Sequence, residues 1–245
     1  MKTNLKVNIL WLFLLLAGYG LISVLVSAGV LNLFHVQILE QIGINIILAV
    51  GLNLIVGFSG QFSLGHAGFM SIGAYTAALF TKSNLIPGVG GYVLALILGG
   101  LVAMIIGVVI GIPALRLRGD YLAILTLAFC EIIRVLIEFF KFTGGAKGLT
   151  GIKLNKNFAI IYIIMLLCVF MMYTFMKSRH GRAILSIRED EIASESSGIN
   201  LTFYKTLAFA YSAFFAGVAG GMYAHYIGIL GAKNFDFNKS IDILV

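Results

Sequence analysis

Residues Tyr92–Ile112 decide the fold class, and they read YVLALILGGLVAMIIGVVIGI, without a single charged side chain. A helix needs about 20 mostly apolar residues to cross the hydrocarbon core of a bilayer. The run is continuously apolar rather than alternating between apolar and polar residues, which excludes a strand of a membrane β-barrel. The stretch therefore predicts one membrane-spanning helix.

Similar runs lie on both sides of this stretch, and together they predict an all-α, polytopic integral membrane protein. The seven apolar segments are Ile9–Leu31, Gln37–Gly57, 62–80, Tyr92–Ile112, Tyr121–Phe140, Phe158–Met176 and Phe203–Leu230. The first segment is longer than the apolar core of a signal peptide, about 7–15 residues, so we expect an uncleaved helix there. The third segment is short and predicts either a full span or a half-helix. Residues 1–245 are interpreted as a single transmembrane domain.

The composition agrees with a membrane protein and excludes several other classes. Hydrophobic residues make up 60% of the chain and charged residues 11%, against roughly 45–50% and about 25% in soluble domains. A chain of this size could not bury so much apolar surface in one core. A soluble enzyme, a disordered protein and a nucleic-acid-binding module are therefore excluded. The net charge of +7 is interpreted as loop lysines and arginines that set the orientation in the membrane.

A glycine- and serine-rich break, Gly57–Gly68, separates the second and third runs. Irregular backbone at membrane depth is tolerated only where it is buried in protein or lines a water-filled cavity. The break therefore predicts part of a translocation pathway, with a plain turn between two spans as the alternative. For its histidine, packing against a neighbour is the alternative to a pathway role. The candidate pathway residues are Asn53, Ser59, Gln61, Ser63 and His66.

The fifth run contains three charged residues at helical spacing, Glu131, Arg134 and Glu138. Spacings of three and four residues place both carboxylates on the face of the guanidinium. Charges inside a membrane are costly, so we expect these side chains to pair and to face the interior of the bundle. The pattern favours a structural ion pair, and contact with a zwitterionic solute is the alternative.

Segment 177–202 is the only long polar stretch between two apolar runs. If the N-terminus is cytoplasmic and each run crosses once, this segment lies in the cytoplasm. Residues Ala183, Ile184, Ile187, Glu191 and Ile192 recur near helical spacing, which predicts a short amphipathic helix ended by Gly198 and Asn200. A helix with mixed charges and an apolar face fits the groove of a cytoplasmic partner, and a solvated loop is the alternative.

Motifs for chemistry are missing from the sequence. Gly144–Gly148 lacks the spacing of a phosphate-binding loop, so any drive by ATP must come from another chain. Gly57–Gln61 fails the nucleophile pattern of hydrolases at its last position. We expect no catalytic residue, no metal site and no cofactor, and hence a protein that is not an enzyme.

Four stretches resemble motifs of branched-chain amino acid ABC transporter permeases, and of their M-type subunits in particular. They are Gly51–Tyr75, Leu115–Tyr121, Thr143–Leu149, and Ile187–Ala193 with Gly198–Asn200. The resemblance implies the ABC importer permease architecture and a multi-pass place in the bacterial inner (plasma) membrane. It also implies a second permease subunit in a heterodimer, two ABC ATPase subunits and a periplasmic or extracellular substrate-binding protein.

The resemblance assigns segment 177–202 as the cytoplasmic coupling loop that docks in an ATPase groove. Its docking motif reads Glu195-Ser-Ser-Gly198, with serines where relatives often have alanine and a larger apolar residue. The candidate coupling residues are Arg188, Glu189, Asp190, Glu191, Glu195 and Gly198.

The implied function is the import of leucine, isoleucine or valine, driven by separate ATPase subunits. One alternative is a permease of the same family for urea or short-chain amides. Another is a self-contained secondary transporter or channel, which would carry solute without an ATPase. The family usually continues with more helices after a glycine-rich segment, and Ser240–Val245 shows no helix stop, so we expect a C-terminally truncated chain.

Overall fold

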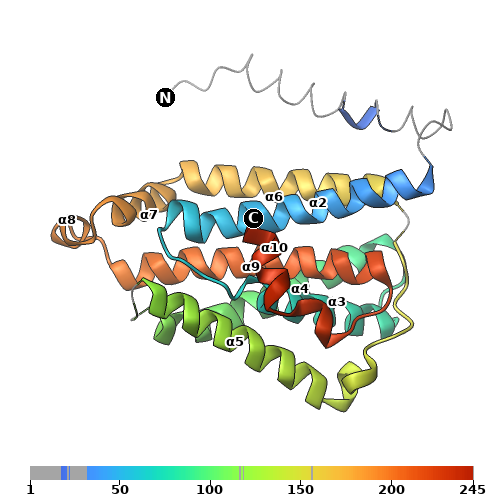
Figure 1. Ribbon diagram of the computed structural model, residues 1–245. Coiled ribbons are helices and arrows are strands. Elements are labelled where there is room, and N and C mark those ends of the chain that lie inside the picture. The colour runs from blue at the N-terminus through green and yellow to red at the C-terminus, as the bar shows by residue number, and fades with distance from the viewer. Residues whose placement is uncertain are drawn as a thin grey trace.

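The computed structural model describes residues 18–20, 22, 32–115, 117, 119–155 and 157–244, and these residues form a bundle of helices without a regular sheet (Figure 1). The predicted all-α class is confirmed. The segment expected at Ile9–Leu31 lies almost wholly outside the described residues.

Six long helices make up the bundle, and short helices connect them. The long helices are α2 (Leu33–Asn53), α3 (His66–Lys82), α4 (Val89–Ala114), α5 (Asp120–Phe139), α6 (Phe158–Lys177) and α9 (Leu201–Ile227). The short ones are α7 (Arg179–Glu189), α8 (Glu191–Ser196) and α10 (Phe237–Leu244). A π-helix, η1 (Leu54–Phe58), continues α2, and the 3-10 turns are η2 (Lys141–Thr143), η3 (Gly145–Lys147) and η4 (Ala232–Phe235).

Among the described residues, four helices are long and apolar enough to span a membrane. They cover Phe34–Phe58, Val89–Ala114, Phe158–Lys177 and Leu201–Ile227. The predicted count of seven is not confirmed. Helix α3 has 17 residues and is about 25 Å long at 1.5 Å per residue, which is short for a span. Helix α5 is long enough, with 20 residues, but it carries the charged side chains of Glu131, Arg134 and Glu138.

The loops gather at two opposite ends of the bundle. At one end, α7 and α8 project beyond the long helices (Figure 1). At the other end, Lys82 donates to the Thr150 carbonyl, Lys153 donates to Asn84, and Leu149 pairs with Leu230. We call these the elbow end and the loop end.

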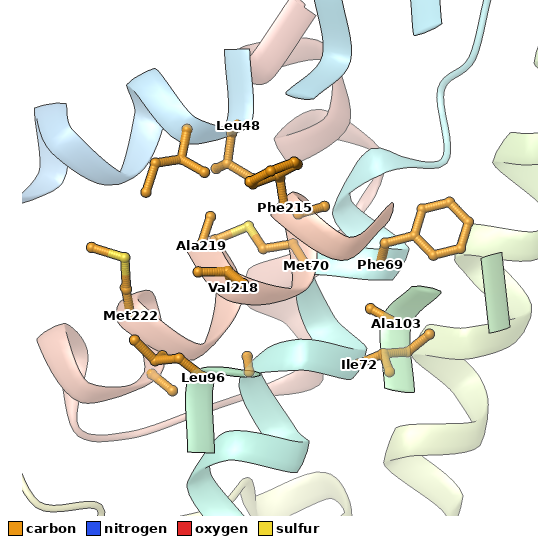
Figure 2. Close-up of a cluster of buried hydrophobic side chains, with 14 of the residues drawn as sticks. Leu48, Phe69, Met70, Ile72, Leu96, Ala103, Phe215, Val218, Ala219 and Met222 are labelled. Carbon is orange, nitrogen blue, oxygen red and sulfur yellow. The ribbon is translucent and has the colours of Figure 1, made fainter. Parts of the chain in front are cut away.

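The core is built where α3, α4 and α9 touch at their backbones. A Cβ added at Gly73 of α3 would overlap the backbone of Gly217 in α9, and one added at Gly217 would lie 2.7 Å from Ala103 Cβ in α4. Small residues at four-residue spacing allow such close approach in membrane helices. Figure 2 shows the adjoining apolar cluster, with Leu48 beside Phe215 on one side and Leu96 near Met222 on the other.

Candidate functional site

The predicted break is a real interruption of the helix. Helix α2 widens into the π-helix η1, where the Ser59 amide donates to the Leu54 carbonyl at 3.2 Å. Gly60 then takes a positive φ of 68°, a left-handed conformation that favours glycine. The chain turns back toward the middle of the bundle and helix α3 begins there at His66 (Figure 1).

Side chains from distant helices hold the start of α3. The Thr126 hydroxyl of α5 accepts from the Leu64 amide at 3.0 Å, and the Ser240 hydroxyl of α10 accepts from the Ala67 amide at 3.3 Å. The first amides of a helix have no partner within the helix, so the Ser240 hydroxyl replaces a local cap for the Ala67 amide, while the Thr126 hydroxyl holds the chain just before the helix. The start of the broken helix is therefore held in part by α5 and α10.

Four of the five predicted pathway residues are buried at the break. Ser59, Gln61, Ser63 and His66 are between 2% and 6% exposed. The His66 ring hydrogen-bonds the Leu48 backbone, whereas its Nε2 and both amide atoms of Gln61 lack a hydrogen-bond partner among the described residues. Buried polar groups without partners are uncommon in native structures, so the break holds hydrogen-bonding groups that the described residues do not satisfy.

Asn53, the fifth predicted pathway residue, does not join this group. Its side chain is exposed on α2, as is that of Asn45, and its Oδ1 lies so close to Gly57 that a Cβ there would clash. Asn45 and Asn53 are eight residues apart, about 80° around a helix of 3.6 residues per turn, which places both side chains on one side of α2. In the described chain this side faces away from the core.

Segment 177–202, which we call the elbow, contains two helices, α7 and α8, instead of the one amphipathic helix predicted. Asp190 takes an extended conformation (φ −156°, ψ 111°), which ends α7, and its carboxylate accepts from the Ile192 and Ala193 amides at 2.9 and 3.0 Å. Asp190 is thus the N-cap of α8. Gly198 follows α8 with φ 83°, and Asn200 caps the start of α9 rather than ending the elbow.

The change of direction at Asp190 separates the apolar residues of the elbow. Ile184 and Ile187 are 1% and 2% exposed against the bundle, whereas Ile192 is 79% exposed. The expectation of one shared apolar face was wrong for Ile192, because it belongs to the second helix. The outer face of α8 therefore presents an isoleucine beside the exposed Glu195.

Besides the cap at Asp190, two of the predicted coupling residues bind other parts of the bundle. Lys205 Nζ of α9 lies 2.5 Å from Glu191 Oε1. Arg188 Nη1 donates to the Gly57 carbonyl at the end of η1, and its aliphatic stem passes Gly60. Glu189, Asp190, Glu195 and Gly198 are exposed. The elbow is thus attached to the break on one side and open to solvent on the other.

The structure also forms the charge group of α5. Arg134 Nε lies 2.7 Å from Glu131 Oε2, and Arg134 Nη1 lies 3.6 Å from Glu138 Oε2. The three side chains keep between 26% and 38% of their surface exposed, so in the described chain they border the bundle instead of pointing into it.

Sequence reasoning missed the residues that hold the break. Thr126 and Ser240 carry no motif, and each lies far along the chain from the amide that it binds. A hydroxyl inside an otherwise apolar segment is the only signal that could have drawn attention to Thr126.

Comparison with known proteins gives one family match that covers most of the chain. Residues 34–245 match the family model described as branched-chain amino acid transport system / permease component. The chain is 36% identical over 208 residues to the high-affinity branched-chain amino acid transport system permease proteins LivM of Salmonella typhimurium and Escherichia coli. A probable branched-chain amino acid transport permease protein LivM of Methanocaldococcus jannaschii is 24% identical over 156 residues.

The coverage of these matches is unequal. The two bacterial alignments include 71% of this chain but 48% of each relative, and the archaeal one includes 59% and 45%. The chain therefore spans about half the length of the curated relatives it matches. No solved structure matches it.

Proposed function

The chain belongs to the family of permease components of branched-chain amino acid transport systems, and on this premise we propose that it is a transmembrane subunit of an ABC importer for leucine, isoleucine and valine. It is a multi-pass membrane protein with several apolar helices. In the proposal it lies in the bacterial inner membrane beside a second permease subunit, with two ATPase subunits below and a substrate-binding protein outside.

The observation that carries the proposal is the two-sided elbow. Its inner face is fixed to the bundle by Ile184 and Ile187. Its outer face offers Ile192 and Glu195 without burying them. An apolar anchor beside charged groups is typical of a docking surface, and the sequence lacks a nucleotide-binding motif of its own. The elbow is therefore suited to receive movement from a separate ATPase.

Arg188 gives that movement a route toward the pathway. Its guanidinium binds the carbonyl of Gly57, and this carbonyl belongs to the segment that leads into the broken helix α3. A shift of α7 would pull directly on η1 and on the break. We propose that ATP-driven displacement of the elbow changes the path of residues 57–65 and so alternates access. Coupling of this kind requires contacts that differ between the two states.

We assign the break itself as the inner part of the pathway. Discontinuous helices in transporters lie near the bilayer midplane, where their exposed backbone and polar side chains contact substrate. The unpartnered atoms of Gln61 and His66 fit this role. The ion pairs of Arg134 are assigned as structural, since both carboxylates are already matched by the guanidinium.

Recovery of the ATPase with tagged permease tests the docking role of the elbow. Glu195→Arg and Ile192→Asp should lower ATPase recovery strongly and leave membrane insertion unchanged, because both side chains point outward. Asp120→Arg is the matched control, since it makes the same charge change at an exposed residue outside the elbow. Glu191 is unsuitable for this purpose because its substitution also breaks the pair with Lys205.

Two results would contradict the proposal. If ATPase recovery is equal for Glu195→Arg, Ile192→Asp and Asp120→Arg, the outer face of the elbow is not the docking surface. Uptake of leucine by the purified chain in vesicles without any ATPase would favour a self-contained transporter or channel.

A further inference from the structure

A cavity of about 250 Å³ opens at the loop end, far from the elbow and separate from the break. The loop after α3, the first turns of α4, residues 153–155 and the end of α9 surround it. Its floor is formed by Thr81, Tyr92 and His225, and its rim includes the exposed Lys153. The volume falls just below the range of drug-sized pockets, about 300–1,000 Å³, so the cavity suits a small solute.

The floor contains polar atoms that the chain leaves free. Tyr92 is 7% exposed and lies near the Asn155 side chain, but neither Tyr92 Oη nor Asn155 Nδ2 makes a hydrogen bond of normal geometry among the described residues. His225 is different, because its Nδ1 binds the Gly221 carbonyl at 2.7 Å and its Nε2 binds Thr81 Oγ1 at 3.0 Å. Both free groups can donate, and both belong to residues that line the same cavity.

One lysine and the start of a helix lie beside these donors. Lys153 Nζ is held by Asn84 Oδ1 at 2.8 Å, which uses one of its three hydrogens. Helix α4 begins at Val89 after Gly88, a residue without a side chain to cap the first amides. Uncapped amides at a helix start attract anions. The ammonium, the hydroxyl, the carboxamide and the helix start all belong to residues that line the cavity, so a carboxylate placed there has several donors within the same site.

The remaining walls are apolar. Ile86, Val89, Leu154 and Ile160 line the cavity. The cavity therefore combines donors for a carboxylate with an apolar wall for an aliphatic side chain.

We propose that this loop-end cavity binds the carboxylate and the aliphatic side chain of an α-amino acid. The carboxylate binds Lys153, Tyr92 and Asn155, and the side chain lies against the apolar wall. This inference rests on the proposed function, since the transported solute would bind this cavity first, on the side opposite the elbow, before it reaches the break.

Direct binding of radiolabelled leucine to the assembled transporter in nanodiscs, without the soluble binding protein, tests the cavity. Lys153→Met and Tyr92→Phe should each weaken binding roughly tenfold, the effect of about 1.4 kcal/mol. Lys82→Met is the matched control, because Lys82 lies at the same end and donates to the Thr150 carbonyl outside the cavity. Leucinamide, which lacks the carboxylate, should compete at least tenfold less well than leucine.

The outcomes separate the cavity from the proposed function. Equal affinity in Lys153→Met and Lys82→Met, or full competition by leucinamide, overturns the cavity as an amino-acid site. If Tyr92→Phe does not assemble, the comparison of Lys153→Met with Lys82→Met decides, because Lys153 is exposed. A wild-type transporter that hydrolyses ATP but imports no leucine refutes the proposed substrate instead. Variants that lose uptake only with the binding protein present, at unchanged leucine affinity, identify the rim as a docking face and also overturn the cavity.

Discussion

Replacing Gly217 by alanine tests whether close backbone packing holds the core together. The new Cβ would lie 2.7 Å from Ala103 Cβ, 2.8 Å from the Gly99 carbonyl oxygen and 3.0 Å from Gly100 Cα. Ordinary contacts of this kind are about 3.5–4.0 Å. All three neighbours belong to the backbone or to a side chain that cannot rotate away, so α4 and α9 must separate by most of an ångström.

The cost can be estimated by comparison with a second glycine. Overpacking of a dense core costs about 1–3 kcal/mol, while alanine is favoured over glycine within a helix by about 1 kcal/mol. Gly90→Ala in α4 measures the helix preference of alanine without overpacking, since a Cβ there meets nothing within 4 Å. The difference in unfolding free energy between Gly217→Ala and Gly90→Ala should therefore be about 1–3 kcal/mol.

The assay is unfolding in mixed micelles titrated with SDS and followed by circular dichroism. Gly217→Ala should unfold at a lower SDS fraction than wild type, and Gly90→Ala at an equal or slightly higher one. If the two variants unfold together, the contact between α4 and α9 does not limit the stability of the bundle, and the reasoning from backbone contact fails.

Three further predictions concern the elbow and the break. Arg188→Met should reduce ATP-driven uptake several-fold with normal ATPase recovery in pull-downs, because it removes the bond to Gly57; normal uptake would disprove the proposed link. Asp190→Ala should destabilise α8 by about 1 kcal/mol, the usual cost of a lost N-cap, and lower ATPase recovery, whereas Asp190→Asn should restore most of it; equal recovery in both variants would exclude the cap as the cause. His66→Leu should reduce uptake without loss of assembly, as judged by size-exclusion chromatography, and full uptake would favour a packing role.

The long helices could be predicted because their signal is local. Residues 92–112 are apolar throughout, and helix α4 covers Val89–Ala114. The break was predictable for the same reason, since glycine and serine in an apolar region disfavour a continuous helix. What the pattern could not supply was the depth of the break or the hydroxyls from α5 and α10 that hold it.

The elbow shows where periodicity stops being sufficient. An aspartate can remain within a helix or leave it to cap the next one, and both choices fit the spacing of Ile187 and Ile192. The structure takes the second choice at Asp190, which turns Ile192 outward. The loop-end cavity was beyond reach for a different reason, because Tyr92, Lys153 and His225 come together only through the packing of three separate segments.

The glycine contacts among α3, α4 and α9 have a consequence for how the protein can move. At these glycine contacts the backbones touch directly, so the helices cannot slide past one another there by small steps. We expect the three helices to travel as one rigid body during a transport cycle. Rearrangement must then occur at the borders of this rigid body, where α6 is largely exposed and where the break joins α2. No hinge motion is expected between α4 and α9.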